Sequence, residues 1–420
     1  MIDPRLLRDD FESVATALAR RGYDRDDLVA LAELDDRRRN LVAEVDQARA
    51  AQRSASKAIG QAAPDERQAM IDAASALKTR VGDLEVQLAE VEREHAARFA
   101  PVPNLPHPEA PDGVEGDGIV LRTFGERPAF DFEVRDHVEL LESADALDLA
   151  RAAKVSGARF AYLKGEGALL EFALVRYAID VAMRHGHVPV IPPVLVREEA
   201  MYGTGFLPTD EQQIFMTRDD DFYLVGTSEV PLAALHMDEL LDEEQLPIRY
   251  VGYSPCFRRE AGTHGKDTRG ILRVHQFEKV EMFSFVHPDL ADAEHERILS
   301  IEEEIFTGLG VHAQVVDIPV GDLGASAARK FDIEAWLPGQ DAYREVTSCS
   351  NTTDYQARRL KARIRQREGD NLLVHTLNGT ALAVQRAIIA LVETHQRADG
   401  SVVVPVALQS YLGREVLFAR

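Results

Sequence analysis

The sequence predicts an α+β protein in which an N-terminal antiparallel two-helix coiled-coil arm precedes a domain built on an antiparallel β-sheet flanked by helices. Three observations predict this fold class. Apolar residues recur in heptads through residues 28–99, and a stretch rich in Pro, Gly and acid follows at 101–118. Beyond it, strands and helices mix without the alternation typical of a parallel sheet. We therefore expect an N-terminal domain at residues 1–110 and a second domain at 111–420.

The arm is predicted from two apolar seams. The first has steps of three and four residues with Arg38 and Gln52 as polar interruptions, and it comprises Leu34, Leu41, Val45, Ala48, Ala55 and Ile59. Gly60 and Pro64 end it. The second seam has no polar break and comprises Met70, Ala74, Leu77, Val81, Leu84, Leu88 and Val91. Two such helices can bury their seams on each other as a hairpin roughly 45 Å long, at ~1.5 Å per residue.

The charge around the expected turn of this hairpin is positive, although the formal net charge of the whole chain is −23. Between residues 49 and 80, six basic side chains outnumber three acidic ones; the basic ones are Arg49, Arg53, Lys57, Arg67, Lys78 and Arg80. An isolated arm with a basic tip favours contact with an extended polyanion. A solvated helical surface and a dimerisation coiled coil remain open as alternatives at this stage.

The second domain shows a few strong local patterns. Residues 168–184 form an amphipathic helix that Gly186 ends. Residues 188–196 are a short apolar strand interrupted by two prolines, and 273–286 are a long strand. Residues 372–377 are a short strand that leads into a helix from Ala381. No glycine-rich phosphate loop follows any of these strands, so a nucleotide would have to bind by another device.

The composition also indicates a compartment. No apolar run approaches the ~20 residues that span a bilayer, and the first residues lack the pattern of a secretory signal. The two cysteines, Cys256 and Cys349, lie far apart in the sequence. They are expected to be buried, reduced thiols rather than a disulfide or a structural zinc site. We therefore expect a cytoplasmic protein with no membrane contact.

Charged side chains stand where a strand hairpin is expected. Arg258, Arg259 and Glu260 end one strand, a polar loop spans 261–270, and the long strand returns. Strand alternation places one set of side chains on a common face: Arg273, His275, Phe277, Lys279, Glu281, Phe283 and Phe285. A face that mixes aromatic rings with Arg, His and Glu favours a ligand surface, although charges on an edge strand could produce it too.

Arg386 is predicted to lie in the apolar stripe of the last helix, because Leu382, Arg386 and Ile389 are spaced as one helical face. A buried guanidinium needs an anionic partner, and a structural carboxylate and a ligand phosphate are equal candidates. Thr380, at the expected start of this helix, is most simply a helix N-cap.

Small polar residues with an acid occur in two further places. Glu345 and Ser348 offer oxygen atoms to a hard cation such as Mg²⁺. Residues three apart lie on opposite faces of a regular strand, so a shared metal requires a bulge or a strand end there. Thr227, Ser228 and Glu229 precede an apolar helical segment, where a hydroxyl would routinely cap the helix.

In this order, the segments resemble the three signature motifs of class II aminoacyl-tRNA synthetases. VPVIPPVLV resembles motif 1, which forms the dimer interface in that class, and FRREAGTHGKDTRGILRVHQFEKVEMF resembles motif 2. LNGTALAVQRAI resembles motif 3 and ends near the arginine Arg386. MYGTGFLP, GTSEVPLAALH and YREVTSCSNTTDYQARR, together with the helical arm, are similar to the seryl-tRNA synthetases specifically. Thr380 stands where many members carry Ser, and Gln385 replaces a smaller residue.

The resemblance implies roles at the matching positions. Arg258 would contact the α-phosphate of ATP and the serine carboxylate, Arg386 the γ-phosphate of a bent ATP, and both are the expected catalytic residues. The full set expected at ATP is Arg258, Arg259, Glu260, Val274, Phe277, Glu345, Val346, Thr347, Ser348 and Arg386. Within it, Glu260 would orient the adenine amino group, Phe277 would stack on the ring, and Glu345 and Ser348 would hold the Mg²⁺ that accompanies ATP.

The resemblance also implies a serine pocket and partners. The residues expected at serine are Thr227, Ser228, Glu229, Arg258, Glu281 and Thr380. Members of this family are homodimers whose arm contacts the long variable arm of tRNA(Ser), and tRNA(Sec) would be charged with serine as well. Ligases that load amino acids onto carrier proteins resemble only the catalytic part, so the arm favours tRNA. A coiled-coil scaffold without catalysis would leave Arg258, Glu345 and Arg386 without a purpose.

Overall fold

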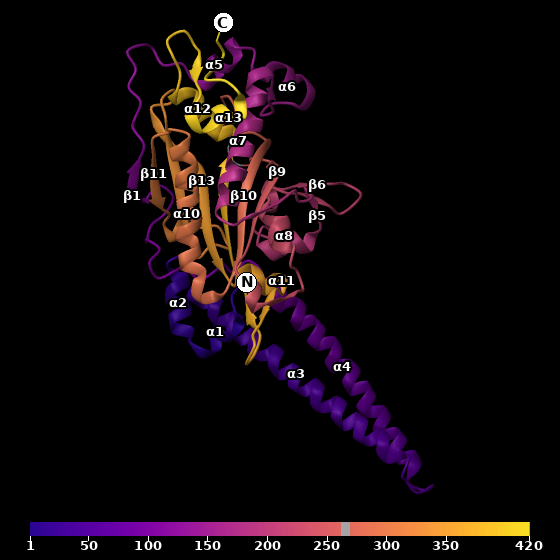
Figure 1. Ribbon diagram of the computed structural model, residues 1–420. Coiled ribbons are helices and arrows are strands. Elements are labelled where there is room, and N and C mark those ends of the chain that lie inside the picture. Colours follow the sequence, from indigo (N-terminus) through magenta and orange to yellow (C-terminus); the bar gives the residue numbers. More distant parts are fainter. Residues whose placement is uncertain (262–268, 420) are drawn as a thin grey trace. The chain divides into compact units, whose positions relative to one another are not determined.

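The computed structural model describes residues 1–261 and 269–419, which form two compact units, Met1–Leu105 and Pro106–Arg420 (Figure 1). Most of the polar loop expected at 261–270, including the GKDT stretch of the motif 2 resemblance, lies outside the described residues. None of the helices within the described ranges is long and apolar enough to cross a membrane.

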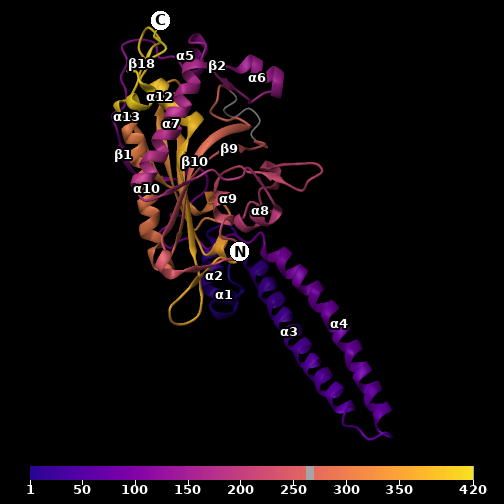
Figure 2. The same cartoon turned by 45° about the vertical axis from the view of Figure 1, so that its right-hand side comes forward.

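The first unit is helical and contains the predicted hairpin. Its elements are α1 (Pro4–Asp9), α2 (Phe11–Ala19), α3 (Arg25–Ile59) and α4 (Arg67–Phe99). The long helices α3 and α4 pack side by side, as both views show (Figures 1 and 2). Val45, Ala48, Val81 and Leu84 of the two seams form one buried cluster. The antiparallel pairing is also supported by polar contacts, because Asp35 Oδ1 lies 3.1 Å from His95 Nε2 and Arg49 donates to Glu85 at 2.7 Å. The predicted arm is therefore confirmed.

The second unit is built on an eight-stranded sheet. Its strands, in spatial order, are β1 (Ile119–Phe124), β11 (Ala313–Asp317), β12 (Arg329–Leu337), β13 (Ala342–Thr353), β16 (His375–Ala383), β10 (Gln276–Val286), β9 (Ile248–Phe257) and β4 (Val188–Val190). Neighbouring strands are antiparallel except for β4 and β9, which are parallel. The predicted antiparallel sheet is confirmed.

Helices and small sheets complete this unit. The helices are α5 (His137–Ser143), α6 (Leu149–Ser156), α7 (Gly165–Arg184), α8 (Glu198–Thr204), α9 (Glu229–Ala234), α10 (Ala291–Gly308), α11 (Tyr355–Leu360), α12 (Val384–Thr394) and α13 (Val406–Leu412). The short strands are β2 (Leu147–Asp148), β3 (Tyr162–Leu163), β5 (Leu195–Val196), β6 (Phe215–Met216), β7 (Tyr223–Leu224), β8 (Leu240–Asp242), β14 (Arg363–Arg365), β15 (Leu372–Leu373), β17 (Val402–Val403) and β18 (Val416–Leu417).

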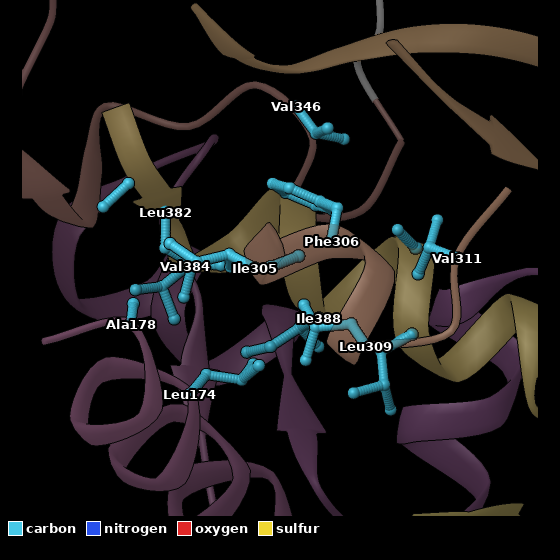
Figure 3. Packing of buried hydrophobic residues seen from close by; sticks show 14 of the residues in the cluster. Leu174, Ala178, Ile305, Phe306, Leu309, Val311, Val346, Leu382, Val384 and Ile388 are labelled. Carbon is cyan, nitrogen blue, oxygen red and sulfur yellow. The ribbon is translucent and has the colours of Figure 1, made fainter. Parts of the chain in front are cut away.

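The main core lies between the sheet and α7, α10 and α12. Figure 3 shows side chains of all three helices, among them Leu174, Ile305 and Ile388, meeting Val346 and Leu382 of the central strands. The helix predicted at 168–184 is confirmed and begins three residues earlier, at Gly165. Polar side chains of two central strands also reach α10, because Ser284 donates to Glu294 at 2.8 Å and Asn351 donates to Asp292 at 3.2 Å.

Several predicted boundaries are wrong. The strand expected from Arg273 begins only at Gln276, and the strand expected at 188–196 is split by its prolines into β4 and β5, which belong to different sheets. Phe283 and Phe285, expected on a ligand surface, are fully buried in a second core cluster with Leu232. Prolines end strand pairing because they lack a backbone donor, and the two phenylalanines are core residues because α9 covers that part of the face.

The start of the last helix is also corrected. β16 continues to Ala383, and α12 begins at Val384, so Leu382 lies in a strand and not in the same helical stripe as Arg386. Thr380 is therefore not the N-cap; that position is Ala383. The strand is prolonged because β16 is central in the sheet, where pairing with β10 as far as Ala383 outweighs the local helix signal.

Candidate active site

A cavity of about 290 Å³ opens at one end of the central strands. Nine of the ten residues expected at ATP line it: Arg258, Glu260, Val274, Phe277, Glu345, Val346, Thr347, Ser348 and Arg386. The tenth, Arg259, is exposed and outside the lining, and its backbone N–H donates to the Gln213 carbonyl at 2.9 Å. Four strands and α12 thus bring residues as distant in the sequence as Arg258 and Arg386 to one cavity.

The cavity exists because the two central strands separate at this end. The ladder between β13 and β16 runs only from Cys349 opposite Gly379 to Thr353 opposite Thr376. Register shifts lie nearby in both strands, between Glu345 and Thr347 against β12 and between Thr380 and Leu382 against β10. Bulges of this kind re-aim side chains. A metal shared by Glu345 and Ser348 requires a bulge or a strand end between them. The first register shift is such a bulge, and both residues line the cavity.

Arg258 and Phe277 form one wall of the cavity. The guanidinium carbon of Arg258 lies 5.3 Å from the centre of the Phe277 ring, and its Nε donates to the Gly226 carbonyl at 3.2 Å. This contact fixes a cation beside an aromatic face. Glu260, which has a left-handed φ of 49°, accepts a hydrogen bond from Arg273 at 3.0 Å. A planar ring and a phosphate could therefore be bound next to each other.

Arg386 forms the opposite wall, and its anionic partner is a carboxylate. Its Nη1 lies 3.1 Å from the Glu345 carboxylate and donates to the Glu345 backbone carbonyl at 2.9 Å. Partial loss of solvation in the cavity favours the neutral form of Glu345, whose side chain is still 43% exposed, but the cations Arg386, Lys330 and Arg258 outweigh this effect and lower the pKa of that carboxyl. Glu345 is therefore ionised at neutral pH, as a ligand of a hard cation must be.

A buried polar cluster adjoins the cavity through Thr380 and Lys279, which line it. Glu281 is 1% exposed, and its Oε2 lies 2.6 Å from the Lys279 ammonium and accepts a hydrogen bond from the Thr380 hydroxyl at 3.2 Å. The structure thus gives Thr380 a side-chain partner in place of the capping role. Lys279 pairs with Glu281 along one strand face, as the alternation of β10 predicts.

The second half of this cluster surrounds Glu229. Its Oε1 accepts hydrogen bonds from Gln356 Nε2 at 2.7 Å and Asn378 Nδ2 at 3.0 Å. Burial, and then repulsion from Glu281, raise the pKa of Glu229 to about 7. Thr227, the residue before the N-cap of α9, accepts a hydrogen bond from the Glu229 N–H at 3.1 Å, whereas the N-cap itself makes no side-chain capping bond. Thr227 and Glu229 are buried behind the cavity lining.

Ser228 takes a different place. It occupies the N-cap position of α9 without a side-chain capping bond, and its hydroxyl lies 2.8 Å from the Ser254 hydroxyl. Its side chain is fully buried. The hydrogen bond to Ser254 ties α9 to β9, so Ser228 fixes the backbone that carries Thr227 and Glu229.

Four residues of the site had no assigned role from the sequence. Lys279 and Lys330 line the cavity, and Gln356 and Asn378 bind Glu229. Lys279 could have been found from its place between Phe277 and Glu281 on one strand face. Gln356 lies in α11, and no local pattern connects it with Glu229, which is 127 residues away.

The two cysteines and the expected metal ligands Glu345 and Ser348 all lie in the second unit. Cys256 and Cys349 are free and buried, as predicted. The described ranges contain no group of three or more His, Cys, Asp or Glu side chains placed to hold a metal ion. Glu345 and Ser348 supply two protein oxygens, which suits a Mg²⁺ ion whose other ligands come from phosphates and water.

The six basic residues of the arm are exposed on the two long helices. Arg49, Arg53 and Lys57 lie on α3, and Arg67, Lys78 and Arg80 lie on α4. Arg49 is held by the ion pair with Glu85. All six side chains are therefore accessible, and their role at a polyanion stays a prediction.

The sheet, the strand hairpin that carries Arg258 and the strand–helix unit that carries Arg386 define a class II aminoacyl-tRNA synthetase core. Residues 213–395 match the family model described as the class II core domain of the tRNA synthetases for G, H, P, S and T. Residues 1–106 match the seryl-tRNA synthetase N-terminal domain. The chain belongs to the seryl-tRNA synthetase family.

Similar proteins support this membership over the whole length. The serine–tRNA ligase of Acidothermus cellulolyticus is 54% identical, with 99% of both chains covered, and that of Nocardia farcinica is 50% identical with the same coverage. A solved seryl-tRNA synthetase from Pyrococcus horikoshii, complexed with ATP, superposes with a TM-score of 0.92 at 39% identity and covers 99% of both chains. The cytoplasmic serine–tRNA ligase of Naegleria fowleri, in complex with AMP, gives 0.88 at 30% identity over 99% of this chain and 98% of that one.

Proposed function

We propose that this chain acts as the serine–tRNA ligase that its family membership indicates. It activates L-serine with ATP to seryl-adenylate, releases pyrophosphate, and transfers serine to the 3′ end of tRNA(Ser). The observation that carries this proposal is the continuity between the cavity lined by Arg258, Phe277 and Arg386 and the buried cluster of Lys279, Glu281 and Thr380. A nucleotide-sized cavity thus adjoins groups that suit a small substrate with a hydroxyl.

In the activation step, the serine carboxylate attacks the α-phosphorus of ATP and pyrophosphate leaves. The protein supplies no covalent nucleophile; it aligns the reactants and stabilises phosphate charge. Arg258 would bind the α-phosphate and the serine carboxylate. Its position beside the ring of Phe277, on which adenine would stack, supports this role. Val274, also in the lining, would contact the nucleotide through its backbone.

Arg386 would bind the γ-phosphate at the other wall. Arg386 is paired with Glu345, so phosphate binding would exchange one anionic partner of Arg386 for another. The freed carboxylate of Glu345, with the Ser348 hydroxyl, would hold the Mg²⁺ ion, which screens the charge of the phosphates. Val346 and Thr347 would position this segment, and Glu260 would accept a hydrogen bond from the adenine amino group. Arg259, which is exposed and outside the lining, is also proposed to contact ATP.

Serine recognition is assigned to the buried cluster. Glu281 and Thr380 would bind the serine hydroxyl, and Glu229, with Thr227, would bind the ammonium group. Ser228 would keep these two residues in place through its bond to Ser254. Alanine would be rejected because it would leave the buried polar groups of Glu281 and Thr380 without a partner.

The remaining parts of the proposal concern tRNA and assembly. Residues 1–110 form the tRNA-binding domain, whose exposed basic residues contact the tRNA backbone, and residues 111–420 form the catalytic domain. RNA helices hide their base edges in a deep groove, so this contact depends on shape and phosphate charge. The chain also charges tRNA(Sec) with serine, forms a homodimer through its motif 1 segment, and works in the cytoplasm.

The test is ATP–pyrophosphate exchange with each of the twenty amino acids in the absence of tRNA. Serine-specific exchange supports the proposal. Exchange with a different amino acid would overturn the pocket assignment, and no exchange with any of them would overturn the activity itself.

A further inference from the structure

A buried carboxyl group lies behind the point where the two central strands separate. Glu302 belongs to α10, which packs on the helical side of β13 and β16, and its side chain is 0% exposed. Neither of its carboxyl oxygens has a hydrogen-bond partner of normal geometry within the described residues. Burial, and then repulsion from Glu281 and Asp332, raise its pKa well above the usual value, while Thr347 and Cys349 act in the opposite direction. Its surroundings thus favour the neutral form of this carboxyl group in the core.

The surroundings of Glu302 are the residues that end the ladder between the strands. A Cβ atom added to Gly379 would lie 2.2 Å from Ile298 Cγ2, 2.8 Å from Glu302 Oε1 and 3.1 Å from the Cys349 Cβ. The carboxyl therefore lies directly against the backbone of residue 379. The next residue is Thr380, whose hydroxyl donates to Glu281.

A second connection runs through Thr347. Its hydroxyl donates to the Thr380 carbonyl at the point where the regular β13–β16 ladder has ended. The carboxyl of Glu302 lies against β16 at Gly379, and Thr347 and Cys349 of β13 lower its pKa, so the group faces both strands at the separation. Glu302 therefore lies between residues 345–348, which line the cavity, and the backbone of Thr380.

Packing alone does not account for an acid here. A buried polar group without a full set of hydrogen bonds lowers stability, and an apolar side chain of similar volume would be neutral or stabilising. We propose that Glu302 is a positioning residue for serine recognition, which holds Thr380 in register through Gly379 and Thr347 at the separation of β13 and β16. This inference rests on the proposed function of Thr380 and Glu281 at the serine hydroxyl.

The experiment measures serine-dependent ATP–pyrophosphate exchange and thermal unfolding for the full chain and its variants. Glu302→Met should raise the KM for serine at least tenfold, leave the KM for ATP within twofold and leave Tm unchanged or higher. Glu302→Gln, which keeps the shape and neutrality of the acid, should keep the serine KM within threefold. Glu302→Asp withdraws the carboxyl from Gly379 by one methylene and should raise the serine KM three- to tenfold. This variant tests the proposal even if Glu302→Met does not fold.

Glu294→Gln is the matched control. Glu294 is a buried carboxylate on the same helix, but it is bonded to Arg249 and Ser284, away from the strand separation. This control should lower Tm and leave the serine KM within twofold. A Glu302→Met variant with lowered Tm and unchanged serine KM would overturn the inference and make Glu302 a packing residue.

A double-mutant cycle tests the route of the effect. Thr380→Val removes the hydroxyl that Glu302 is proposed to hold in place, so adding Glu302→Met to it should raise the serine KM by less than threefold. Independent, multiplicative effects would overturn the route through Thr380. Absence of serine exchange in the unchanged protein is a separate result, because it would refute the proposed function rather than the role of Glu302.

Discussion

Glu281 is the residue whose replacement tests serine recognition most directly. It is buried, with Oε2 2.6 Å from the Lys279 ammonium and 3.2 Å from the Thr380 hydroxyl. Glu281→Gln keeps the shape of the side chain and one acceptor oxygen but removes the charge. The substrate hydroxyl would then bind a neutral amide in place of a carboxylate, with Thr380 still beside it.

The size of the effect follows from two terms. A hydrogen bond to a charged group contributes about 1.5–3 kcal/mol, and a buried group left imperfectly paired costs about 1–3 kcal/mol more. The two contributions add to about 2.5–6 kcal/mol. The lower half of that range, about 3–4 kcal/mol, corresponds to a fall of roughly 10²–10³-fold in kcat/KM for serine. The variant should also be less stable by about 3–5 kcal/mol, because the Lys279 ammonium loses its buried carboxylate.

The assay is serine-dependent ATP–pyrophosphate exchange below the unfolding transition of the variant, with the KM for ATP measured in parallel. The ATP KM should stay within about threefold, since Glu281 is outside the lining of the ATP cavity. Glu294→Gln again serves as the control, because it breaks a buried ion pair of comparable geometry, at 2.6 Å, without a contact to the site. Near-normal kcat/KM for serine in Glu281→Gln would refute the assignment of this carboxylate to the substrate.

Three further predictions concern the arm, the metal and the pH. Replacing residues 49–80 by a short turn should leave pyrophosphate exchange intact and abolish tRNA charging; charging by the shortened protein would contradict the role of the basic surface. Glu345→Gln should raise the Mg²⁺ concentration for half-maximal exchange by about 10–100-fold, and an unchanged Mg²⁺ titration would remove Glu345 from the metal site. Because the pKa of Glu229 is raised from 4.5 to about 7, its stabilising contribution is complete below pH 4.5 and is lost as the pH rises toward about 7. Urea unfolding should therefore show up to about 3 kcal/mol of pH-dependent loss that Glu229→Gln removes, whereas identical slopes would show that Glu229 does not titrate in this range.

The arm was predictable in detail because a coiled coil depends on local sequence. Each helix buries a seam whose positions recur every three or four residues, so the pattern can be recognised without knowledge of any distant contact. For the sheet, the antiparallel arrangement was predictable from the sequence, but the ends of the strands were not. The end of β16 at Ala383 is fixed by pairing with Lys279, more than a hundred residues away, and the local sequence around Thr380 favours a helix start instead.

The cavity lining was predictable where residue types carry the chemistry. Arg258, Phe277 and Arg386 have side chains that suit a nucleotide, and the resemblance to class II motifs placed them together. The partners that tune the site were not predictable in this way. Gln356 bonds to Glu229 across 127 residues, and Lys330 reaches the cavity from β12, so only the packed sheet reveals them.

The separation of β13 and β16 explains why the side chains proposed to bind substrates and the charged side chains of the core occur at the same place. A continuous ladder between β13 and β16 would pair the backbone of residues 345–348 and 380–383 and leave no room for a ligand. Where the ladder ends at Cys349 and Gly379, side chains must take over the bonding, as the Thr347 hydroxyl does with the Thr380 carbonyl. The charged side chains at this place are paired with one another, Arg386 with Glu345 and Lys279 with Glu281. Ligands that bind only the folded chain stabilise it, and ATP, Mg²⁺ and serine would do so here by adding partners to pairs that the opening of the sheet has already brought together.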